Sequence, residues 1–321
     1  MHLVKVLILG ITGFAGRAAL NMFSSQGLKD ISGTYRHSTA NRGISKLNGE
    51  PSLYECDINE AVSIENVLNE IKPDIIFHFC SYVSVFSSLK NPTSTYQTNV
   101  IGTINLLEAV KKVVPLAKVL LPGSAEQYGF VSEKKMPIKE TYSLNPANPY
   151  AVSKKHQEEI GLYYYKQFGL NLYFTRTFHC TGPYQPIGFV CSDIAKQIVG
   201  VERDVSSSIK IGNLDAKRDF TDIRDVVAAY WQIINDGVPG QIYNVCVGKS
   251  ISIQNILDKL IGFSGKNIQT TIDQSKLRKS DVPDFIGCNT KLKKIGWTPK
   301  YTIEQSLEDL LNRTRAGSYE L

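Results

Sequence analysis

The chain opens with an apolar segment that runs straight into regularly spaced glycines. The segment LVKVLIL is followed by GITGFAG, which places Gly10, Gly13 and Gly16 three residues apart. Glycines between a strand and a helix let the backbone approach a pyrophosphate at the helix N-terminus, although a tight turn alone also uses them. The spacing is G-x-x-G-x-x-G rather than the G-x-G-x-x-G of the dinucleotide fingerprint. We predict a cofactor loop formed by these glycines together with Thr12 and Phe14.

Apolar segments of strand length alternate with helical patterns through the first half of the chain. Strands are predicted over residues 3–9, 31–35, 75–79, 118–121 and 172–175, and helices from residue 14 and over 61–71, 99–113 and 150–168. Parallel strands that are buried on both faces are apolar along their whole length. The alternation therefore predicts an α/β fold, a Rossmann-type doubly wound parallel sheet with helices on both faces.

The alternation of strands and helices changes after Arg176, where a loop with several glycines and prolines leads into shorter mixed elements. Helices are expected there near Ile194, Val226, Ile256 and Leu307. We predict two domains. Residues 1–176, with return segments near 219–236, form the Rossmann domain, and residues 177–321 form a smaller mixed α/β substrate lobe.

Composition and charge narrow the class of function. A hydrophobic fraction of 42% with 21% charged residues is ordinary for a soluble globular protein. The net charge of +6 is spread along the chain rather than gathered in one basic stripe, which argues against nucleic-acid binding. No apolar segment is long enough to span a bilayer, so we expect a cytoplasmic protein without membrane contact. The six cysteines form no C-x-x-C pair and the five histidines show no i, i+4 spacing, so we expect reduced thiols and no metal site.

The segment after the second predicted strand bears on the choice of coenzyme. It reads GTYRHSTANR and lacks the acidic side chain that an NAD site usually offers to the ribose 2′-hydroxyl. Arg36, and less directly Arg42, are placed to face a 2′-phosphate, although solvated surface arginines are the alternative. NADP(H) is therefore favoured, with NAD(H) as the alternative. Asp57 and Ile58 follow the third strand and are placed near the adenine, and a helix cap is the alternative role of Asp57.

The segment NPYAVSKK places Tyr150 and Lys154 four residues apart at the start of a helix. These positions share one helix face, so the ammonium can lie near the phenol and the cofactor ribose and lower the pKa of the phenol, together with an oxidised nicotinamide. A Y-x-x-x-K pair alone is frequent by chance. Ser124, at the end of the preceding strand, can hydrogen-bond the substrate oxygen or the phenol, and its presence indicates proton transfer.

The glycine loop, Ser124, Tyr150 and Lys154 resemble, in their order and spacing, the extended short-chain dehydrogenase/reductase family. The segments PDIIFHFCSYVSV and TNVIGTINLLEAV add to this likeness, which covers essentially the whole chain. In that family the tyrosine protonates or deprotonates a substrate oxygen while hydride moves at the adjacent carbon. The lysine holds the ribose and the serine polarises the same oxygen. The resemblance implies these catalytic roles here, and it places Ser84 at the substrate.

The resemblance also implies a homodimer. Family members commonly pair through the helices of the Asn99 and Tyr150 segments. The apolar positions that would allow such a four-helix interface are Ile104, Leu107, Ile160 and Tyr164. The same residues are alternatively plain core.

Three later segments resemble the GDP-sugar branch of the family, the GDP-mannose 4,6-dehydratases and the GDP-6-deoxy-4-keto-D-mannose reductases. They read TRTFHCTGPYQPIGFV, IGNLDAKRDFTDIRDVVAAYW and KLRKSDVPDFIG. The likeness implies a GDP-sugar substrate whose phosphates contact Arg218 and Arg278 and whose ribose contacts Asp281. Arginine suits this role because its planar fork binds phosphate through two hydrogen bonds. The alternative is a surface ion pair with Asp219, Asp225 or Asp281.

Further substrate contacts follow from the same resemblance. Val190 and Asn213 are expected to line the pocket of the base. His179 stands where family members usually have asparagine, which puts the usual contact with the nucleotide sugar in doubt. A neutral imidazole can donate one hydrogen bond or act as an acid or base, and we favour binding.

Glu126 bears on which reaction is catalysed. The dehydratases use a glutamate here to move protons at sugar C5 and C6, and reductases can retain it, so Glu126 excludes neither. The preferred hypothesis is NADPH-dependent reduction of the C4 ketone of a GDP-4-keto-6-deoxyhexose, of the type that converts GDP-4-keto-6-deoxy-D-mannose to GDP-D-rhamnose. A redox-neutral GDP-mannose 4,6-dehydratase with tightly bound NADP is the alternative. A non-catalytic nucleotide-sensing module is the third hypothesis. The sequence leaves the sugar and its C4 configuration open.

Overall fold

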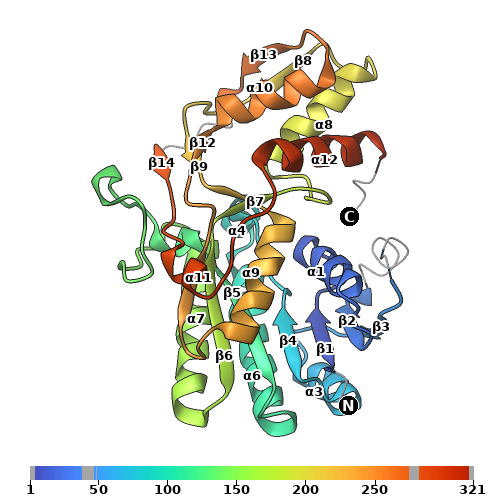
Figure 1. The fold of residues 1–321 in the computed structure, drawn as a ribbon, viewed down its shortest axis with the longest axis vertical. Helices are drawn as coiled ribbons and strands as arrows, with labels where there is room; N and C mark the ends of the chain where they lie inside the picture. The colour runs from blue at the N-terminus through green and yellow to red at the C-terminus, as the bar shows by residue number, and fades with distance from the viewer. Residues whose placement is uncertain (1–3, 38–46, 48, 275–281, 318–321) are drawn as a thin grey trace.

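A seven-stranded parallel sheet forms the centre of the structure, a computed structural model that describes residues 4–37, 47, 49–274 and 282–317. The strands are β1 (Val6–Leu9), β2 (Ile31–Tyr35), β3 (Ser52–Glu55), β4 (Ile75–His78), β5 (Lys118–Ser124), β6 (Asn171–Thr177) and β11 (Ile242–Val245). Their order is β11-β6-β5-β4-β1-β2-β3 (Figure 1). The chain starts inside the sheet and winds outward in both directions, so the predicted doubly wound Rossmann-type fold is confirmed.

Helices cover both faces of this sheet. One face carries α1 (Phe14–Ser25) and α9 (Ile223–Asp236), and the other carries α3 (Ala61–Ile71), α6 (Gly102–Val113) and α7 (Pro149–Phe168). Successive side chains of a strand point to opposite faces, and in β1 Val6 and Ile8 join the first core while Leu7 and Leu9 join the second. Burial on both faces is the reason that these strands are apolar throughout.

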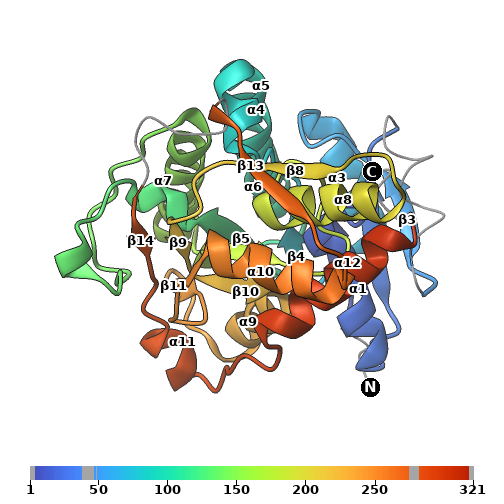
Figure 2. The same ribbon diagram turned by 90° about the horizontal axis from the view of Figure 1, so that it is seen from above.

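A smaller lobe lies beyond the C-terminal ends of the central strands (Figure 1). Its elements are α8 (Val190–Glu202), β8 (Ser208–Ile211), α10 (Ile253–Ser264), β13 (Gln269–Ile272) and α12 (Ile303–Arg315). Seen from above, α8, α10 and α12 lie over this edge of the sheet (Figure 2). The lobe has its own core, in which Ile194, Ile256 and Leu307 are buried.

Short strand pairs connect the large sheet to this lobe. They are β7 (His179–Thr181) with β10 (Phe220–Asp222), and β9 (Lys217–Arg218) with β12 (Ile251–Ser252) and β14 (Asp284–Phe285). The remaining short elements are α4 (Val85–Lys90), α5 (Pro92–Tyr96), η2 (Gln97–Ile101), η3 (Ala125–Tyr128), η4 (Glu133–Lys135) and α11 (Thr290–Lys294). Among the described residues, no helix combines the length and apolarity needed to cross a membrane.

Several elements of the structure have the bounds that were predicted from the sequence. The strand over 31–35 and the helix over 61–71 coincide with β2 and α3. Of the helix expected over 99–113, residues 99–101 belong to the π-helical segment η2, and the α-helix α6 begins at Gly102. Strand β11 pairs with β6, so the chain returns to the large sheet again after 219–236. The division of the chain at residue 176 stays a prediction.

The apolar positions expected at a subunit interface differ in their exposure. Leu107 and Tyr164 are buried within the core of the chain itself, where α6 and α7 pack on the sheet. Ile104 and Ile160 are only partly buried. Leu107 and Tyr164 therefore belong to the core of the chain, which was the alternative to a place in the subunit interface.

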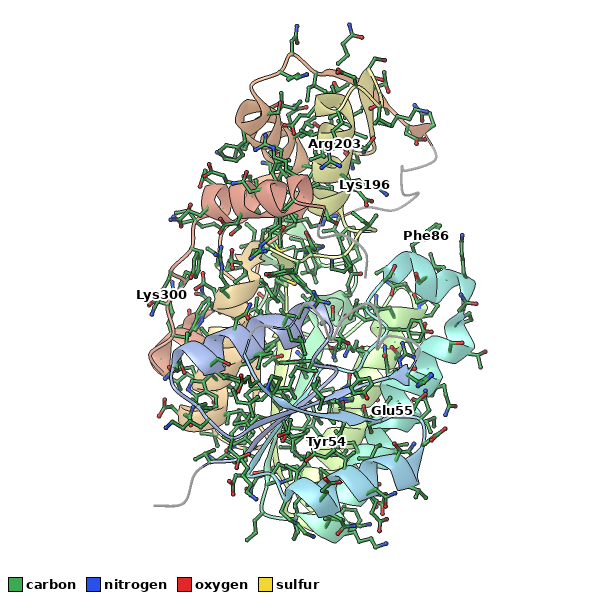
Figure 3. The ribbon with its side chains drawn as sticks, turned by 90° about the vertical axis from the view of Figure 1, so that its right-hand side faces the viewer. Tyr54, Glu55, Phe86, Lys196, Arg203 and Lys300 are labelled. Carbon is green, nitrogen blue, oxygen red and sulfur yellow. The ribbon has the colours of Figure 1, made fainter. Side chains whose placement is uncertain are left out.

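An aromatic cluster between α1, β4 and α9 gives a direct test of this packing. Phe23 is fully buried, with its ring 5.1 Å from that of Phe77 and 5.0 Å from that of Trp231. We expect Phe23→Ala to lower the free energy of unfolding by about 3–5 kcal/mol, because a cavity replaces the ring. The control is Phe86→Ala, since Phe86 is 67% exposed at the outer surface of α4 (Figure 3) and its loss should cost less than about 0.5 kcal/mol. Equal losses in urea unfolding would contradict the assignment of Phe23 to the core.

Candidate active site

The glycine loop turns between the end of β1 and the start of α1. Gly10 has a φ of +80°, and its N–H donates to Thr34 Oγ1 at 3.1 Å, which ties the loop to β2. A Cβ on Gly16 would lie 2.4 Å from Gly10 O, so no side chain fits there. A Cβ on Gly13, the N-cap of α1, would meet only Gly10 O at 3.3 Å. The N–H groups of the first helical turn, including that of Phe14, have no partner within the helix, so the loop fits a phosphate anion.

The residues expected at the adenine end follow neighbouring strands. Arg36 comes directly after β2 and is exposed, while Asp57 and Ile58 come after β3. Asp57 Oδ1 accepts from the backbone N–H of Asn59 at 2.9 Å, so this carboxylate orders the turn before α3. Ile58 is buried. Arg42 lies outside the described residues.

Strand β5 and helix α7 bring Ser124 and Tyr150 together. Ser124 ends β5, and Tyr150 lies in the first turn of α7, whose N-cap Asn148 accepts from the Ala151 N–H at 2.8 Å. Burial raises the pKa of Tyr150 well above 10.0, the hydrogen bond with Ser124 lowers it, and the charge of Glu126 raises it. Glu126 is held by the side chain of Asn148, which donates to Oε2 at 3.1 Å. The serine, the tyrosine and the glutamate thus form one cluster.

Lys154 is buried beside this cluster, but its ammonium is directed to other partners. The Nζ donates to Pro122 O and to Gln157 Oε1, each at 2.8 Å. Burial lowers the pKa of Lys154 from 10.5 to about 7. Lys154 is not among the groups that shift the pKa of Tyr150. Two of the three N–H donors of the ammonium are occupied, so one remains for a ligand.

A buried polar network lies behind the cluster, and the sequence does not reveal it. Arg176 donates to both carboxylate oxygens of Glu158, at 2.9 and 2.7 Å. Gln127 donates to Glu158 at 3.1 Å and accepts from the Ser124 N–H at 2.7 Å. The only signal for Glu158 is its place one turn after Lys154 on the same helix face.

Two expected substrate residues lie on short elements near the edge of the sheet. Ser84 is the N-cap of α4 and accepts from the Ser87 N–H at 3.1 Å. His179 begins β7 and contacts the rings of Phe220 and Phe285, with centroids 5.6 and 6.3 Å away. The neighbouring Cys180, which was not predicted, lies close enough to raise the pKa of Tyr150. Strand β7 therefore borders the cluster of Ser124, Glu126 and Tyr150.

Three of the residues expected at the nucleotide lie on the second lobe or on the strands that connect it to the large sheet. Val190 begins α8, and Asn213 Oδ1 accepts from the Asp215 N–H at 3.1 Å. Arg218 donates to the carbonyl oxygens of Val282, at 2.7 Å, and Lys217, at 2.8 Å. Arg278 and Asp281 lie outside the described residues.

Two of the three carboxylates considered as ion-pair partners of the arginines, Asp219 and Asp225, are buried instead. Asp219 accepts three backbone N–H groups, those of Val247, Gly248 and Gly287, and burial raises its pKa to about 7. Asp225 accepts backbone N–H groups of residues 300 and 301, both at 2.9 Å. Neither carboxylate lies at the surface.

Neither a disulfide nor a metal-binding group of side chains occurs among the described residues. All six cysteines are free thiols. In the described part of the chain, no group of three or more His, Cys, Asp and Glu side chains is arranged to hold a metal ion.

The parallel sheet, the glycine loop and the side chains of Ser124, Tyr150 and Lys154 define an enzyme of the short-chain dehydrogenase/reductase type. The family model for GDP-mannose 4,6 dehydratase matches residues 7–310, and the chain belongs to this family. The resemblance drawn from the motifs is thereby confirmed.

Two curated relatives and two solved structures illustrate the likeness. GDP-6-deoxy-D-mannose reductase of Pseudomonas aeruginosa is 31% identical over 82% of this chain and 86% of that protein. GDP-mannose 4,6-dehydratase of Vibrio cholerae is 25% identical over 97% of this chain and 93% of that protein. The structure of RMD from Pseudomonas aeruginosa complexed with NADPH has a TM-score of 0.84 and 27% identity, covering 98% of this chain and all of that chain. The structure of UDP-glucose 4-epimerase from Thermotoga maritima shares the fold, with a TM-score of 0.88 and 24% identity. The match covers 98% of this chain and 99% of that chain.

The pKa of Lys154 predicts how stability depends on pH. Between about pH 7, the folded pKa, and pH 10.5, the unfolded pKa, the unfolded state binds more protons, so stability rises with pH. From pH 7 to pH 9 we expect the free energy of unfolding of the wild type to rise by about 2 kcal/mol relative to Lys154→Met. The control is Lys155→Met, because the Lys155 side chain is 31% exposed. If urea unfolding gives the wild type and Lys154→Met the same pH slope, the lowered pKa is wrong.

Proposed function

We propose that the protein reduces the C4 ketone of a GDP-4-keto-6-deoxyhexose with NADPH, in the manner of the conversion of GDP-4-keto-6-deoxy-D-mannose to GDP-D-rhamnose. The observation that carries the proposal is the buried, hydrogen-bonded Ser124–Tyr150 pair in a member of this family. The similarity to a GDP-6-deoxy-D-mannose reductase, and to a structure complexed with NADPH, supports the reaction and the coenzyme.

The glycine loop and the end of β2 are proposed to hold the coenzyme. Gly10, Thr12 and Gly13 surround its diphosphate at the N-terminus of α1. Arg36, exposed directly after β2, faces the 2′-phosphate, which favours NADP(H) over NAD(H). When bound, the coenzyme supplies the hydride that the C4 carbon receives. The remaining N–H of Lys154 is available to a ribose hydroxyl.

Tyr150 is the proposed proton donor to the C4 oxygen. Its raised pKa keeps the phenol protonated at neutral pH, so it is ready to donate as negative charge develops on that oxygen. The hydrogen bond with Ser124 lowers the pKa of the phenol and so stabilises the phenolate that proton transfer leaves.

The proposed substrate contacts come from both lobes. Ser84 and His179 are assigned to the sugar side and Arg218 to the diphosphate. Val190 and Asn213 are assigned to the base. Arg278 and Asp281 keep the phosphate and ribose roles implied by the resemblance.

Glu126 favours a second candidate, the redox-neutral GDP-mannose 4,6-dehydratase. Its carboxylate lies near enough to raise the pKa of Tyr150, so it borders the place where a sugar would react. In that reaction the glutamate moves protons at C5 and C6. The similarity to a GDP-mannose 4,6-dehydratase of Vibrio cholerae supports this candidate as well.

Two incubations separate the candidates. Purified protein with GDP-4-keto-6-deoxymannose and NADPH should lose absorbance at the nicotinamide band, and no loss would exclude the reductase. With GDP-mannose and no added reductant, formation of the 4-keto sugar would establish the dehydratase.

Substitution of the proposed proton donor tests the chemistry. Tyr150→Phe should lower kcat by about 10²–10⁴ because phenylalanine has no hydroxyl proton to donate, while NADPH still binds. The control is Tyr163→Phe, which changes a tyrosine on the same helix that is 55% exposed and should keep the wild-type kcat. If no nucleotide sugar turns over and cofactor-dependent partner binding is unaffected by Tyr150→Phe, the chain is a sensing module instead.

We also propose that the protein is a homodimer joined through α5, η2 and α7. These elements pack side by side, and they expose Tyr96, Ile101, Tyr163 and Phe168 by 36–55%. Exposed apolar side chains on adjoining helices are typical of a surface that a second copy covers.

A charge placed in this surface should separate the subunits. We expect Tyr163→Glu to change the mass measured by light scattering from that of two chains to that of one, because a carboxylate would be buried without a partner. The control is Phe130→Glu, at a position that is 61% exposed in the loop after η3. A dimer that survives Tyr163→Glu would place the interface elsewhere.

The free cysteines support a reducing compartment, so we place the protein in the cytoplasm. Recovery of the native protein in a membrane or extracellular fraction would overturn this location.

A further inference from the structure

Arg17 is a buried arginine directly after the last glycine of the cofactor loop. Its side chain is 3% exposed. The Nε donates to Thr12 O at 2.9 Å, so the side chain turns back along α1 toward the loop. It therefore lies beside the first turn of α1, where the N–H groups open to an anion are found.

The guanidinium of Arg17 has no carboxylate partner among the residues that the structure describes. Its Nη2 is buried and makes no hydrogen bond, and burial lowers its pKa. A guanidinium nevertheless stays charged at neutral pH. The positive end of the α1 dipole adds to this charge. A buried charge that lacks a partner is costly, so the place favours an anion that brings both negative charge and acceptor oxygens.

Tyr184 covers Arg17 from the side of the second lobe. Its ring centroid lies 5.8 Å from Arg17 Cζ and 4.5 Å from the Cζ of Arg313 on α12. Tyr184 has a φ of +69°, a left-handed conformation that bulky side chains rarely adopt. Such conformations persist where the surrounding structure holds them, and they cluster at ligand sites.

We propose that Arg17 binds the diphosphate of the coenzyme and helps to determine its affinity and position. The inference rests on the proposed function, since it needs a dinucleotide in the glycine loop. The forked guanidinium keeps its bond to Thr12 O through Nε, while Nη2 donates to a phosphate oxygen. Because Nε is fixed to the glycine loop, the ligand is the coenzyme rather than the diphosphate of the GDP-sugar.

Binding of three ligands tests the assignment by calorimetry. NADPH carries the diphosphate and the 2′-phosphate, adenosine 2′-monophosphate carries only the latter, and GDP reports the substrate site. Arg17→Met should weaken NADPH about 10- to 100-fold and leave the other two ligands within about twofold, because one charge-assisted hydrogen bond is lost. Arg36→Met should weaken NADPH and adenosine 2′-monophosphate together. Arg313→Met is the matched control, which removes the other guanidinium on Tyr184 and should leave NADPH within about twofold.

The other outcomes overturn the inference. If Arg17→Met binds NADPH as tightly as the wild type, or weakens adenosine 2′-monophosphate equally, Arg17 has a structural role only. If GDP weakens instead of NADPH, the diphosphate is that of the substrate. If Arg17→Met does not fold, Arg17→Lys is measured in its place. We expect Arg17→Lys to weaken the affinity for NADPH alone by about 3- to 10-fold. An unchanged affinity for NADPH would overturn the assignment. If the wild-type protein binds no NADPH, the proposed function is wrong. If the wild type binds NADPH and the Arg17 variants bind it equally well, only this inference is wrong.

Discussion

The buried ion pair between Glu158 and Arg176 is the contact on which the geometry of the site depends. Both side chains are 5% exposed, and the pair joins α7 to β6 one helical turn after Lys154. Gln127 extends it to the backbone N–H of Ser124. A buried ion pair contributes little net stability unless its remaining donors and acceptors are satisfied, and here they are shared among several partners. The network thus holds Ser124, and the helix that carries Lys154, through contacts of defined geometry.

Asp219 has the corresponding place between the two lobes. Asp219 is fully buried and lies between β9 and β10. Its carboxylate accepts hydrogen bonds from three backbone N–H groups, which belong to the segments that follow β11 and β14. The chain passes between the lobes at these points, so one carboxylate ties the connections together. Arg218 directly precedes it, and the backbone of this proposed phosphate ligand is therefore held in place. The second lobe is fixed by polar contacts at its base and by its own apolar core.

Local patterns in the sequence predict elements better than they predict what covers them. The strand over 31–35 and the helix over 61–71 follow from the spacing of their apolar residues. That spacing can be seen within each segment alone. Leu107 was considered for an interface because the spacing identifies an apolar face but not its neighbour. The direction of the Lys154 ammonium depends on Pro122, which is 32 residues away. Arg17 reads as an ordinary charged position on a helix, yet in the fold it is buried and lies against the ring of Tyr184, which is far away in the sequence.

Burial shifts the pKa of the proposed proton donor and the pKa values of the buried lysine and histidine of this region. It raises the pKa of Tyr150 above 10.0 and lowers that of Lys154 to about 7 and that of His78 to about 3. At neutral pH the phenol is protonated and ready to donate to an oxygen that becomes negative as C4 is reduced. Dehydration begins with oxidation at C4, in which the phenolate form of Tyr150 would accept the proton of the C4 hydroxyl while the coenzyme accepts the hydride. In the absence of coenzyme the buried phenol is therefore in the protonated form that acts as the donor in reduction, and both candidate reactions use the Ser124–Tyr150 pair.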